Sequence, residues 1–318
     1  MTQANIHLIE TVVAFALIVL LNIFLKKKQI LNGSDTPVFT RLLTQVVLPV
    51  FIFFQLLRYP PGLRYLLPVL AMFIAGCCTL LAAWIIGELM RFSRSTTGAL
   101  MIVSSFGSSA LLGYPLIQYT FPHDPGAMTE AILISELAVG LPIFTLCPLV
   151  AIHFGEASKT AGAPPSTLLQ YFRSPIFIAV ILGFAVSRFH VPLESPFVAP
   201  ILEAGKIING TRAALACLIL GMQIKVGSFK RLLPIVAISA TLQMGLQPLL
   251  AYGQAVLYRL SGLERQVLVL IAAMPSAVLG PVFAVRYKCD GELASTVTFI
   301  NILLAVLGIP VVFWLLGR

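Results

Sequence analysis

The sequence predicts an all-α integral membrane protein of ten membrane-spanning helices, arranged as two repeats of five. Two observations on composition support the membrane assignment. Of the 318 residues, 58% are hydrophobic and only 10% are charged, and the mean hydropathy is +0.97. A soluble protein of this length needs more charged surface, so most of the chain must face lipid or other helices. The third observation is that short motifs recur in the same order in both halves.

Ten apolar segments are long enough to cross a bilayer, which takes about 20 helical residues. Five lie in the first half, at 6–25, 38–57, 66–89, 97–120 and 128–152. Five lie in the second half, at 172–190, 197–222, 232–257, 265–287 and 293–316. The connections are short, and the longest contains "GAPPS". We therefore divide the chain into a first repeat at 1–155, a linker at 156–170 and a second repeat at 171–318.

The basic residues predict the orientation. Thirteen of the 21 lysines and arginines fall in segments on one side of the membrane, seven fall on the other, and Arg212 lies within the seventh span. Basic loops stay in the cytoplasm, so we expect both termini outside and the linker in the cytoplasm. The N-terminus lacks a basic region and the first apolar run is long enough to span, so no cleavable signal peptide is expected. The expected location is a bacterial inner membrane.

Three short motifs recur at nearly constant offsets. "LLPV" at 66–69 returns as "LLPI" at 232–235, "SALLG" at 109–113 returns as "SAVLG" at 276–280, and "VGLP" at 139–142 returns as "LGIP" at 307–310. Because each half has an odd number of spans, the second half enters the membrane from the opposite side. The halves are then inverted repeats, as in many secondary transporters. Chance similarity between apolar helices is the alternative.

The fourth and ninth spans carry helix-breaking residues at matching positions: Gly107, Gly113, Pro115, Pro275, Gly280 and Pro281. A proline inside a helix costs about 3 kcal/mol, and a glycine about 1 kcal/mol relative to alanine. In hydrocarbon, broken backbone is tolerated only where it is buried in protein or lines a wet cavity. A pair of matched breaks favours a binding site over an ordinary proline kink.

Broken helices expose half-helix N-termini, which carry partial positive charge and free N–H donors. Such ends suit an anionic group. Asn301, in the tenth span, either makes an interhelical hydrogen bond or contacts the broken segments. The candidate substrate-binding residues are Ser105, Ser108, Ser109, Gly113, Tyr114, Pro115, Pro275, Ser276, Gly280, Pro281 and Asn301.

Two charged residues lie within spans. A carboxylate at the membrane midplane costs roughly 2.5–3.5 kcal/mol, so Glu136 in the fifth span is a candidate for proton coupling. It can instead lie near the membrane surface or cap a neighbouring helix. Arg212 can pair with an anion or with Glu136, or snorkel to the interface. Gln243 and Gln247 share a face of the eighth span, where we expect packing contacts.

Other classes of function are not indicated. The sequence has no P-loop, G-x-S-x-G, H-E-x-x-H or C-x-x-C motif, so neither ATP-driven transport by this chain alone nor an enzyme is predicted. The four histidines and five cysteines lack metal-ligand spacing, so no metal or cofactor is expected, and the cysteines are interpreted as buried small hydrophobic residues. Basic cytoplasmic loops explain the net charge of +9 better than nucleic-acid binding does.

Four stretches resemble the auxin efflux carrier family, which includes plant PIN-type exporters and bacterial carriers of small carboxylates. The run from 273 to 316 is similar to the last two spans of that family. "SSALLGYPLI" at 108–117 resembles its fourth span, "LILGMQI" at 218–224 its seventh and "VVLPVFIF" at 46–53 its second. The chain differs at Ser108, where members usually carry asparagine, at Leu279, where many bacterial members carry asparagine, and at Ala214, where the family often has proline.

The resemblance implies that broken helices 4 and 9 cross beside the substrate. It also implies a scaffold of spans 1, 2, 6 and 7 and a moving core of spans 3–5 and 8–10. We expect a secondary carrier of a small organic anion, such as a carboxylate or an auxin-like acid. Proton coupling, sodium coupling and uncoupled export driven by the membrane potential all fit the sequence. A bile acid:sodium symporter-like carrier or a receptor of the same fold is the alternative. The expected partners are the substrate, the lipid bilayer and, in a homodimer, a second copy of the chain.

Overall fold

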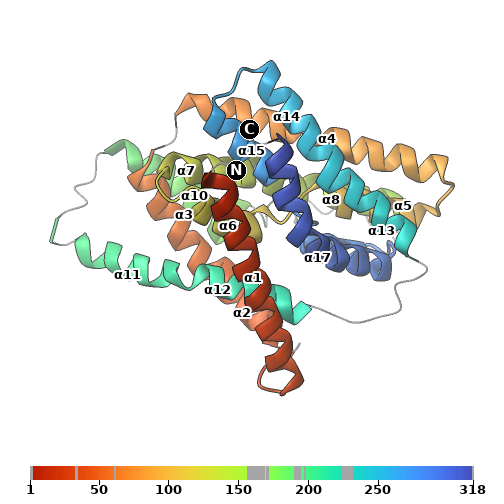
Figure 1. Ribbon diagram of the computed structural model, residues 1–318, viewed down its shortest axis with the longest axis horizontal. Coiled ribbons are helices and arrows are strands. Elements are labelled where there is room, and N and C mark those ends of the chain that lie inside the picture. Colours follow the sequence, from red (N-terminus) through yellow and green to blue (C-terminus); the bar gives the residue numbers. More distant parts are fainter. Residues whose placement is uncertain are drawn as a thin grey trace.

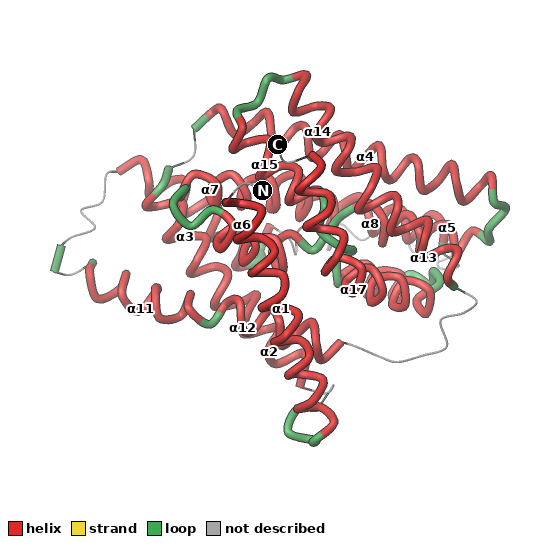
Figure 2. Tube along the Cα trace, viewed as in Figure 1, coloured by secondary structure: helices red, strands yellow, loops and turns green. Residues whose placement is uncertain are grey.

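Figures 1 and 2 show a computed structural model in which the described residues form helices and no strand. The structure describes residues 3–32, 35–60, 62–155, 169, 172–189, 195–196, 198–223 and 232–316. The predicted linker at 156–170 lies outside these residues except for Leu169. The prediction of an all-helical protein is confirmed for the described part of the chain.

Six helices are long and apolar enough to cross a membrane within the described ranges. They correspond to the predicted spans 1, 2, 3, 5, 8 and 10. Three of the six are continuous: α1 (Gln3–Lys27), α4 (Leu66–Leu89), which follows the short 3₁₀ turn η3 (Leu63–Tyr65), and α17 (Gly291–Leu316). The other three each run through a π-helical turn: α2 (Thr36–Leu42), η2 (Leu43–Val47) and α3 (Leu48–Arg58); α7 (Pro125–Leu133), η5 (Ile134–Gly140) and α8 (Leu141–Phe154); α13 (Leu233–Ala240), η8 (Thr241–Leu246) and α14 (Gln247–Leu257).

The remaining four predicted spans form shorter helices, which explains why six rather than ten meet the length requirement. Span 4 is divided into α5 (Arg94–Ser105) and the pair η4 (Ser109–Gly113) and α6 (Tyr114–Thr120). Span 9 is divided into α15 (Gly262–Ala272) and α16 (Leu279–Arg286). Span 7 is divided into α11 (Ala199–Gly210) and α12 (Arg212–Gln223), and span 6 forms α10 (Pro175–Val186) and η7 (Ser187–Phe189).

The π-helical turns of the described chain share one cause. The turns η2, η4, η5 and η8 each end two residues before a proline: Pro49, Pro115, Pro142 and Pro248. Proline lacks the N–H of a helical hydrogen bond, and its ring clashes with the carbonyl four residues earlier. A π turn inserts one extra residue and separates these groups, so the helix continues past the proline. The sequence analysis did not anticipate these turns.

The helices form two sets of neighbours. In one set, α3 packs against α10 and α11, and α1 packs against α12. In the other, α4 packs against α5 and α14, α14 against α15, and α16 against α17. Helix α1 also contacts α6, which belongs to the broken span 4, and α17 from the second set (Figure 1). The broken helices therefore lie between helices from distant parts of the sequence.

Large apolar side chains cover much of the outer surface. Leu17 on α1, Leu66 on α4, Ile181 on α10 and Leu307 on α17 are all more than half exposed. Soluble monomers rarely expose apolar surface on this scale. Lipid contact explains it, because a spanning helix must present apolar side chains to the hydrocarbon core.

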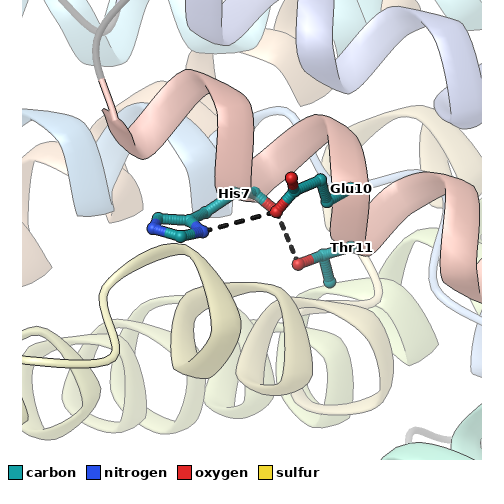
Figure 3. A network of polar contacts seen from close by, with 3 residues as sticks. All are labelled: His7, Glu10 and Thr11. Atoms are coloured by element: carbon teal, nitrogen blue, oxygen red, sulfur yellow. Dashed lines mark hydrogen bonds and ion pairs between the residues drawn. The ribbon is translucent and has the colours of Figure 1, made fainter.

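Near the start of α1 there is a small polar network (Figure 3). His7 Nδ1 lies 3.5 Å from Glu10 Oε2, and Thr11 Oγ1 donates a hydrogen bond to the carbonyl oxygen of His7 at 2.7 Å. The His7 and Glu10 side chains are exposed, so their interaction contributes at most about 1 kcal/mol. No group of three or more His, Cys, Asp or Glu residues that could hold a metal ion occurs within the described ranges.

Candidate functional site

The interruptions of spans 4 and 9 lie side by side and antiparallel. Gly107 and Ser276 form an isolated antiparallel bridge. The Ser108 N–H donates to the Pro275 carbonyl at 2.7 Å, and the Ala277 N–H donates to the Phe106 carbonyl at 3.0 Å. Backbone groups that leave a helix within a membrane protein must find other partners. Here two interruptions, about 167 residues apart in sequence, satisfy each other.

Two amide side chains of span 8 form hydrogen bonds with the broken segments. Gln247 Nε2 donates to the Ser105 carbonyl at 2.7 Å, where α5 ends. Ser276 Oγ donates to Gln243 Oε1 at 2.9 Å. Both glutamines are fully buried. From the sequence we expected packing contacts for these residues, whereas the structure places both amides in hydrogen bonds to the broken segments.

Asn301 on α17 also reaches the interruption. Its Nδ2 donates to Ser276 Oγ at 2.8 Å and to Ser239 Oγ at 3.0 Å. Ser239 Oγ accepts a further hydrogen bond from Ser104 Oγ at 2.8 Å. Of the two roles expected for Asn301, both are present at once: it bonds across helices, and it contacts the broken segment of span 9.

A cavity of about 370 Å³ lies against the interruptions. One wall consists of residues 107–111 and 277–279, which belong to the two breaks and the first turns of the half-helices that follow them. The opposite wall comes from spans 2, 5, 6 and 7. Its described residues are Thr40, Leu43, Thr44, Gln45, Leu48, Ser135, Glu136, Val139, Gly140, Ile143, Phe144, Ser174, Pro175, Ile176 and Ile219.

Both half-helices begin at the cavity. The first N–H groups of a helix have no acceptor within it, and at η4 these belong to Ser109, Ala110 and Leu111, all of which line the cavity. Helix α16 begins at Leu279, which also lines the cavity with Val278 before it. Two positive helix ends therefore face the same space.

Glu136 on η5 closes the cavity on the other side. It is only 4% exposed and accepts a hydrogen bond from the Tyr114 hydroxyl at 2.6 Å. The neighbouring Ser135 hydroxyl lies 2.7 Å from the Ser109 hydroxyl, which stands at the start of η4. Span 5 is thereby joined to the broken span 4 at two adjacent residues. Glu136 is therefore buried beside the break of span 4.

Arg212 is fully buried, so of the possibilities considered from the sequence, snorkelling to the interface does not fit. Its side chain is 1% exposed, and Nη2 donates to Gln118 Oε1 on α6. The guanidinium carbon lies 3.6 Å from the centroid of the Phe51 ring, a favourable cation–π position. Nε and Nη1 have no hydrogen-bond partner among the described residues. Arg212 is not among the residues that line the cavity.

The structure brings together the residues predicted for the site, but only some of them line the cavity. Of the candidates, Ser108, Ser109 and Glu136 line the cavity. The others are not among the described residues that line it: Ser105, Gly113, Tyr114, Pro115, Pro275, Ser276, Gly280, Pro281, Asn301 and Arg212. Sequence reasoning missed Ser135, Thr40, Thr44 and Ser174. For Ser135 a signal existed, since it precedes Glu136; the other three lie near helix beginnings, where polar residues are ordinary.

The five cysteines form no disulfide. Cys147, Cys217 and Cys289 are buried, as predicted, and Cys77 is half-buried. Cys78 is exposed, so the expectation of burial is wrong for that residue. It lies on α4, a helix that exposes apolar side chains along one side, and the small thiol fits such a surface.

Comparison with known proteins gives a consistent result along the whole chain. A family model described as "Membrane transport protein" matches residues 7–151 and 159–313. An uncharacterized transporter of Methanothermobacter thermautotrophicus is 26% identical over 309 residues, covering 95% of this chain and 96% of that protein. The uncharacterized transporter MJ1031 of Methanocaldococcus jannaschii is 24% identical over 314 residues, covering 96% of this chain and 98% of that protein.

Proposed function

The chain belongs to the membrane transport protein family, that of the auxin efflux carriers, and from this premise we propose that it is a secondary active carrier of a small organic anion. The substrate carboxylate binds where the breaks of spans 4 and 9 meet, and transport proceeds by alternating access. Membership of a transporter family, and not of an enzyme family, agrees with the lack of a catalytic motif.

One observation carries the proposal: two half-helix N-termini face a single cavity. Each helix end is equivalent to about half a positive elementary charge and offers unpaired N–H donors. Ser108 and Ser109 add hydroxyl groups at the start of η4. Paired broken helices near the midplane, with their N-termini toward an anionic group, are a recurrent design of secondary transporters.

The proposed architecture has ten spans in two inverted repeats, at 1–155 and 171–318, with helices 4 and 9 crossing at their breaks. The antiparallel bridge between Gly107 and Ser276 supports the crossing. The proposed scaffold contains spans 1, 2, 6 and 7, and the moving core contains spans 3–5 and 8–10. The packing of α1 with α12 and of α3 with α10 supports the first group.

The proposed conformation is open to the cytoplasm. The cavity wall includes Thr40 and Thr44, near the beginning of span 2, and Ser174, immediately before α10. With both termini outside, these positions lie toward the cytoplasmic face of the plasma membrane. On the opposite side, Tyr114, Phe51 and Arg212 are buried and pack together, so they close the route to the outside.

Transport is tested in proteoliposomes loaded with unlabelled 4-methylpentanoate, by measuring counterflow of the labelled compound. We expect saturable uptake that is absent from empty liposomes. Replacement of Ser108 by alanine should reduce the uptake several-fold, because it removes a hydroxyl from the cavity wall. Ser187→Ala is the matched control: Ser187 is buried, donates a hydrogen bond to the nearby Phe184 carbonyl and is not among the described residues that line the cavity.

Absence of counterflow for this acid and for a panel of other small carboxylates would contradict the proposed carrier. Binding of a carboxylate without counterflow would instead indicate the receptor considered from the sequence. Equal uptake by the Ser108→Ala protein and the Ser187→Ala control would remove Ser108 from the site while leaving transport intact.

Sodium coupling of this carrier is supported by two buried amide oxygens beside the break. Asn301 Oδ1 and Gln247 Oε1 have no hydrogen-bond partner among the described residues. Neutral amide oxygens of this kind bind hard cations. Uptake that rises with an inward sodium gradient at constant pH, and falls in Asn301→Ala, would support sodium coupling; uptake driven by a pH gradient alone would support protons.

A further inference from the structure

Resting on the proposed function, we infer that Arg212 is the centre of a second binding site, which holds the substrate carboxylate when the carrier opens to the outside. While the outer side is closed, Gln118 accepts a hydrogen bond from the guanidinium, and on opening the carboxylate replaces this amide. The inference follows from the burial of Arg212, its unused hydrogen-bond donors and its position between the proposed scaffold and the moving core.

The guanidinium of Arg212 is buried with part of its hydrogen-bonding capacity unused. The side chain is 1% exposed, Nη2 donates to Gln118 Oε1, and the charge lies over the ring of Phe51. Within the part of the chain that the structure describes, Nε and Nη1 have no acceptor, and no ion pair includes Arg212. An amide and an aromatic ring are neutral, so the positive charge is not balanced by either. Burying a charge in this way is costly, and a bound anion would reduce the cost.

A carboxylate is the anion that suits these donors. Guanidinium N–H groups match the geometry of carboxylate oxygens, and a hydrogen bond to a charged acceptor is roughly twice as strong as one to a neutral acceptor. The Gln118 oxygen is a neutral acceptor, so a carboxylate would compete with it for Arg212. No lysine, arginine or histidine is among the described residues that line the present cavity. Arg212 would therefore add a charged contact that the described wall of the cytoplasm-facing site lacks.

Arg212 lies just beyond the closed end of the cavity. Ile219 lines the cavity, and Arg212 is about two turns earlier on the same helix, α12. Leu48 also lines the cavity, and Phe51, which packs on Arg212, is about one turn further along α3. With both termini outside, each of these steps leads from the cavity toward the outside. A substrate that leaves or enters on that side would pass the guanidinium.

The contacts of Arg212 connect the two groups of helices that must move apart. Arg212 and Phe51 belong to the proposed scaffold, whereas Gln118 and Tyr114 lie on α6 of the proposed moving core. The rings of Phe51 and Tyr114 are 6.0 Å apart. Alternating access requires the outer side to open, so these contacts between scaffold and core must break. Gln118 is exposed and lies in the last turn of α6, so its displacement uncovers the guanidinium for the substrate.

Counterflow of labelled 4-methylpentanoate, measured separately from each side in right-side-out and inside-out membrane vesicles, tests the inference. The cytoplasmic side is defined as the side from which a cysteine at position 44 is labelled. Arg212→Gln should raise the KM on the outer side roughly tenfold or more, because a charged contact to the carboxylate is lost. It should leave the KM on the cytoplasmic side unchanged. Arg212→Lys keeps the charge but not the planar group, so its outer KM should lie between those of the native protein and Arg212→Gln.

Two further variants serve as controls. Lys206→Gln removes a positive charge from α11 of the same span, but Lys206 is exposed and pairs with Glu203 at 2.7 Å, so both KM values should stay unchanged. Gln118→Ala removes the amide and keeps the guanidinium. Its outer KM should not rise, because the variant frees Arg212 for the substrate and weakens the contact that holds the outer side closed.

Each other outcome overturns the inference in a recognisable way. If Arg212→Gln leaves the outer KM unchanged or lowers it, as Gln118→Ala does, Arg212 only holds the outer side closed, and the proposed carrier stands. If the KM rises equally on both sides, Arg212 supports the cavity common to both conformations and forms no outer site. If Arg212→Gln does not fold, an unchanged outer KM in Arg212→Lys overturns the inference instead. Absence of saturable counterflow in the native protein, for any small carboxylate, would remove the carrier and this site together.

Discussion

At Gly107 the two broken helices approach too closely for a side chain. A β-carbon built there would lie 2.8 Å from the carbonyl oxygen of Met274 and 2.9 Å from the Met274 Cβ. Neither atom can move away easily, because the adjacent backbone is held by the hydrogen bonds of Ser108 and Ala277. Glycine is thus required at this position by close packing of two backbones.

Replacement of Gly107 by alanine should lower the free energy of unfolding by about 1–3 kcal/mol, since a rigid neighbourhood must shift to accept the methyl group. Thermal unfolding of the purified protein in detergent, followed by intrinsic fluorescence, measures this change. Gly253→Ala in α14 is the control: its added Cβ meets no atom within 4 Å, and alanine is the better helix former. Equal midpoints for the two variants would contradict the close contact at Gly107.

The two charged residues singled out within spans have different surroundings. Glu136 faces the cavity with a hydroxyl donor beside it, whereas Arg212 is enclosed by an amide and an aromatic ring. Both were recognisable as unusual from the sequence alone, because charged groups in apolar helices are rare. Their partners were not predictable, because Gln118 and Phe51 are separated from Arg212 by about 94 and 161 residues.

Among the elements, the broken helices depend on their neighbours for hydrogen bonds. The end of α5 leaves carbonyl groups without intrahelical partners. Gln247, at the start of α14, supplies one donor to the Ser105 carbonyl. Glycines and prolines therefore explain why the helix breaks, and the glutamine on another helix explains how the break is stabilised in an apolar environment.

The Gln247→Leu variant should lower the free energy of unfolding by about 1–3 kcal/mol, because it leaves the Ser105 carbonyl buried without its donor. The same unfolding measurement applies. Gln254→Leu is the matched control on the same helix, since Gln254 is only partly buried and lies two turns away from the break. If Gln254→Leu proves as destabilising as Gln247→Leu, the loss does not come from the Ser105 hydrogen bond.

The π-helical turns are the feature of the helices that sequence periodicity did not predict. A single inserted residue shifts the helix face by about 100°, so the residues before and after each proline point in different directions than a regular α-helix would give. Glu136 lies in η5 and Ser109 in η4. The two turns thus help to direct both residues toward the same cavity.

For the whole molecule, the proposed orientation makes span 2, the helix formed by α2, η2 and α3, a test of sidedness. Thr44 lines the cavity near the beginning of this helix, and Arg58 is exposed at its end. The positive-inside rule places the beginning of span 2 in the cytoplasm. The cavity then opens to the cytoplasm, and Arg58 lies outside.

In a cysteine-free background, Thr44→Cys should react with a membrane-impermeant maleimide in inside-out vesicles and not in right-side-out vesicles. Arg58→Cys should show the opposite pattern. A saturating ligand should slow the labelling of Thr44→Cys several-fold, because it fills the cavity, and should leave Arg58→Cys unchanged. Reversed sidedness would overturn the orientation, and an unchanged rate with ligand would place the site elsewhere.

The sequence by itself determined the class of protein, the helical segments and the two interruptions. Composition and apolar length act locally, so they can be read without knowing what packs against what. Proline and glycine likewise break a helix wherever they stand. The same holds for the candidates Ser108, Ser109 and Glu136, which are local signals at or near a break.

Only the tertiary structure decided which of these residues share a space. The bridge between Gly107 and Ser276, the contacts of Gln243 and Gln247, the burial of Arg212 and the contribution of Thr44 and Ser174 to the cavity all join segments far apart in the chain. These contacts depend on how helices pack, and packing is a property of pairs of surfaces that no single segment encodes.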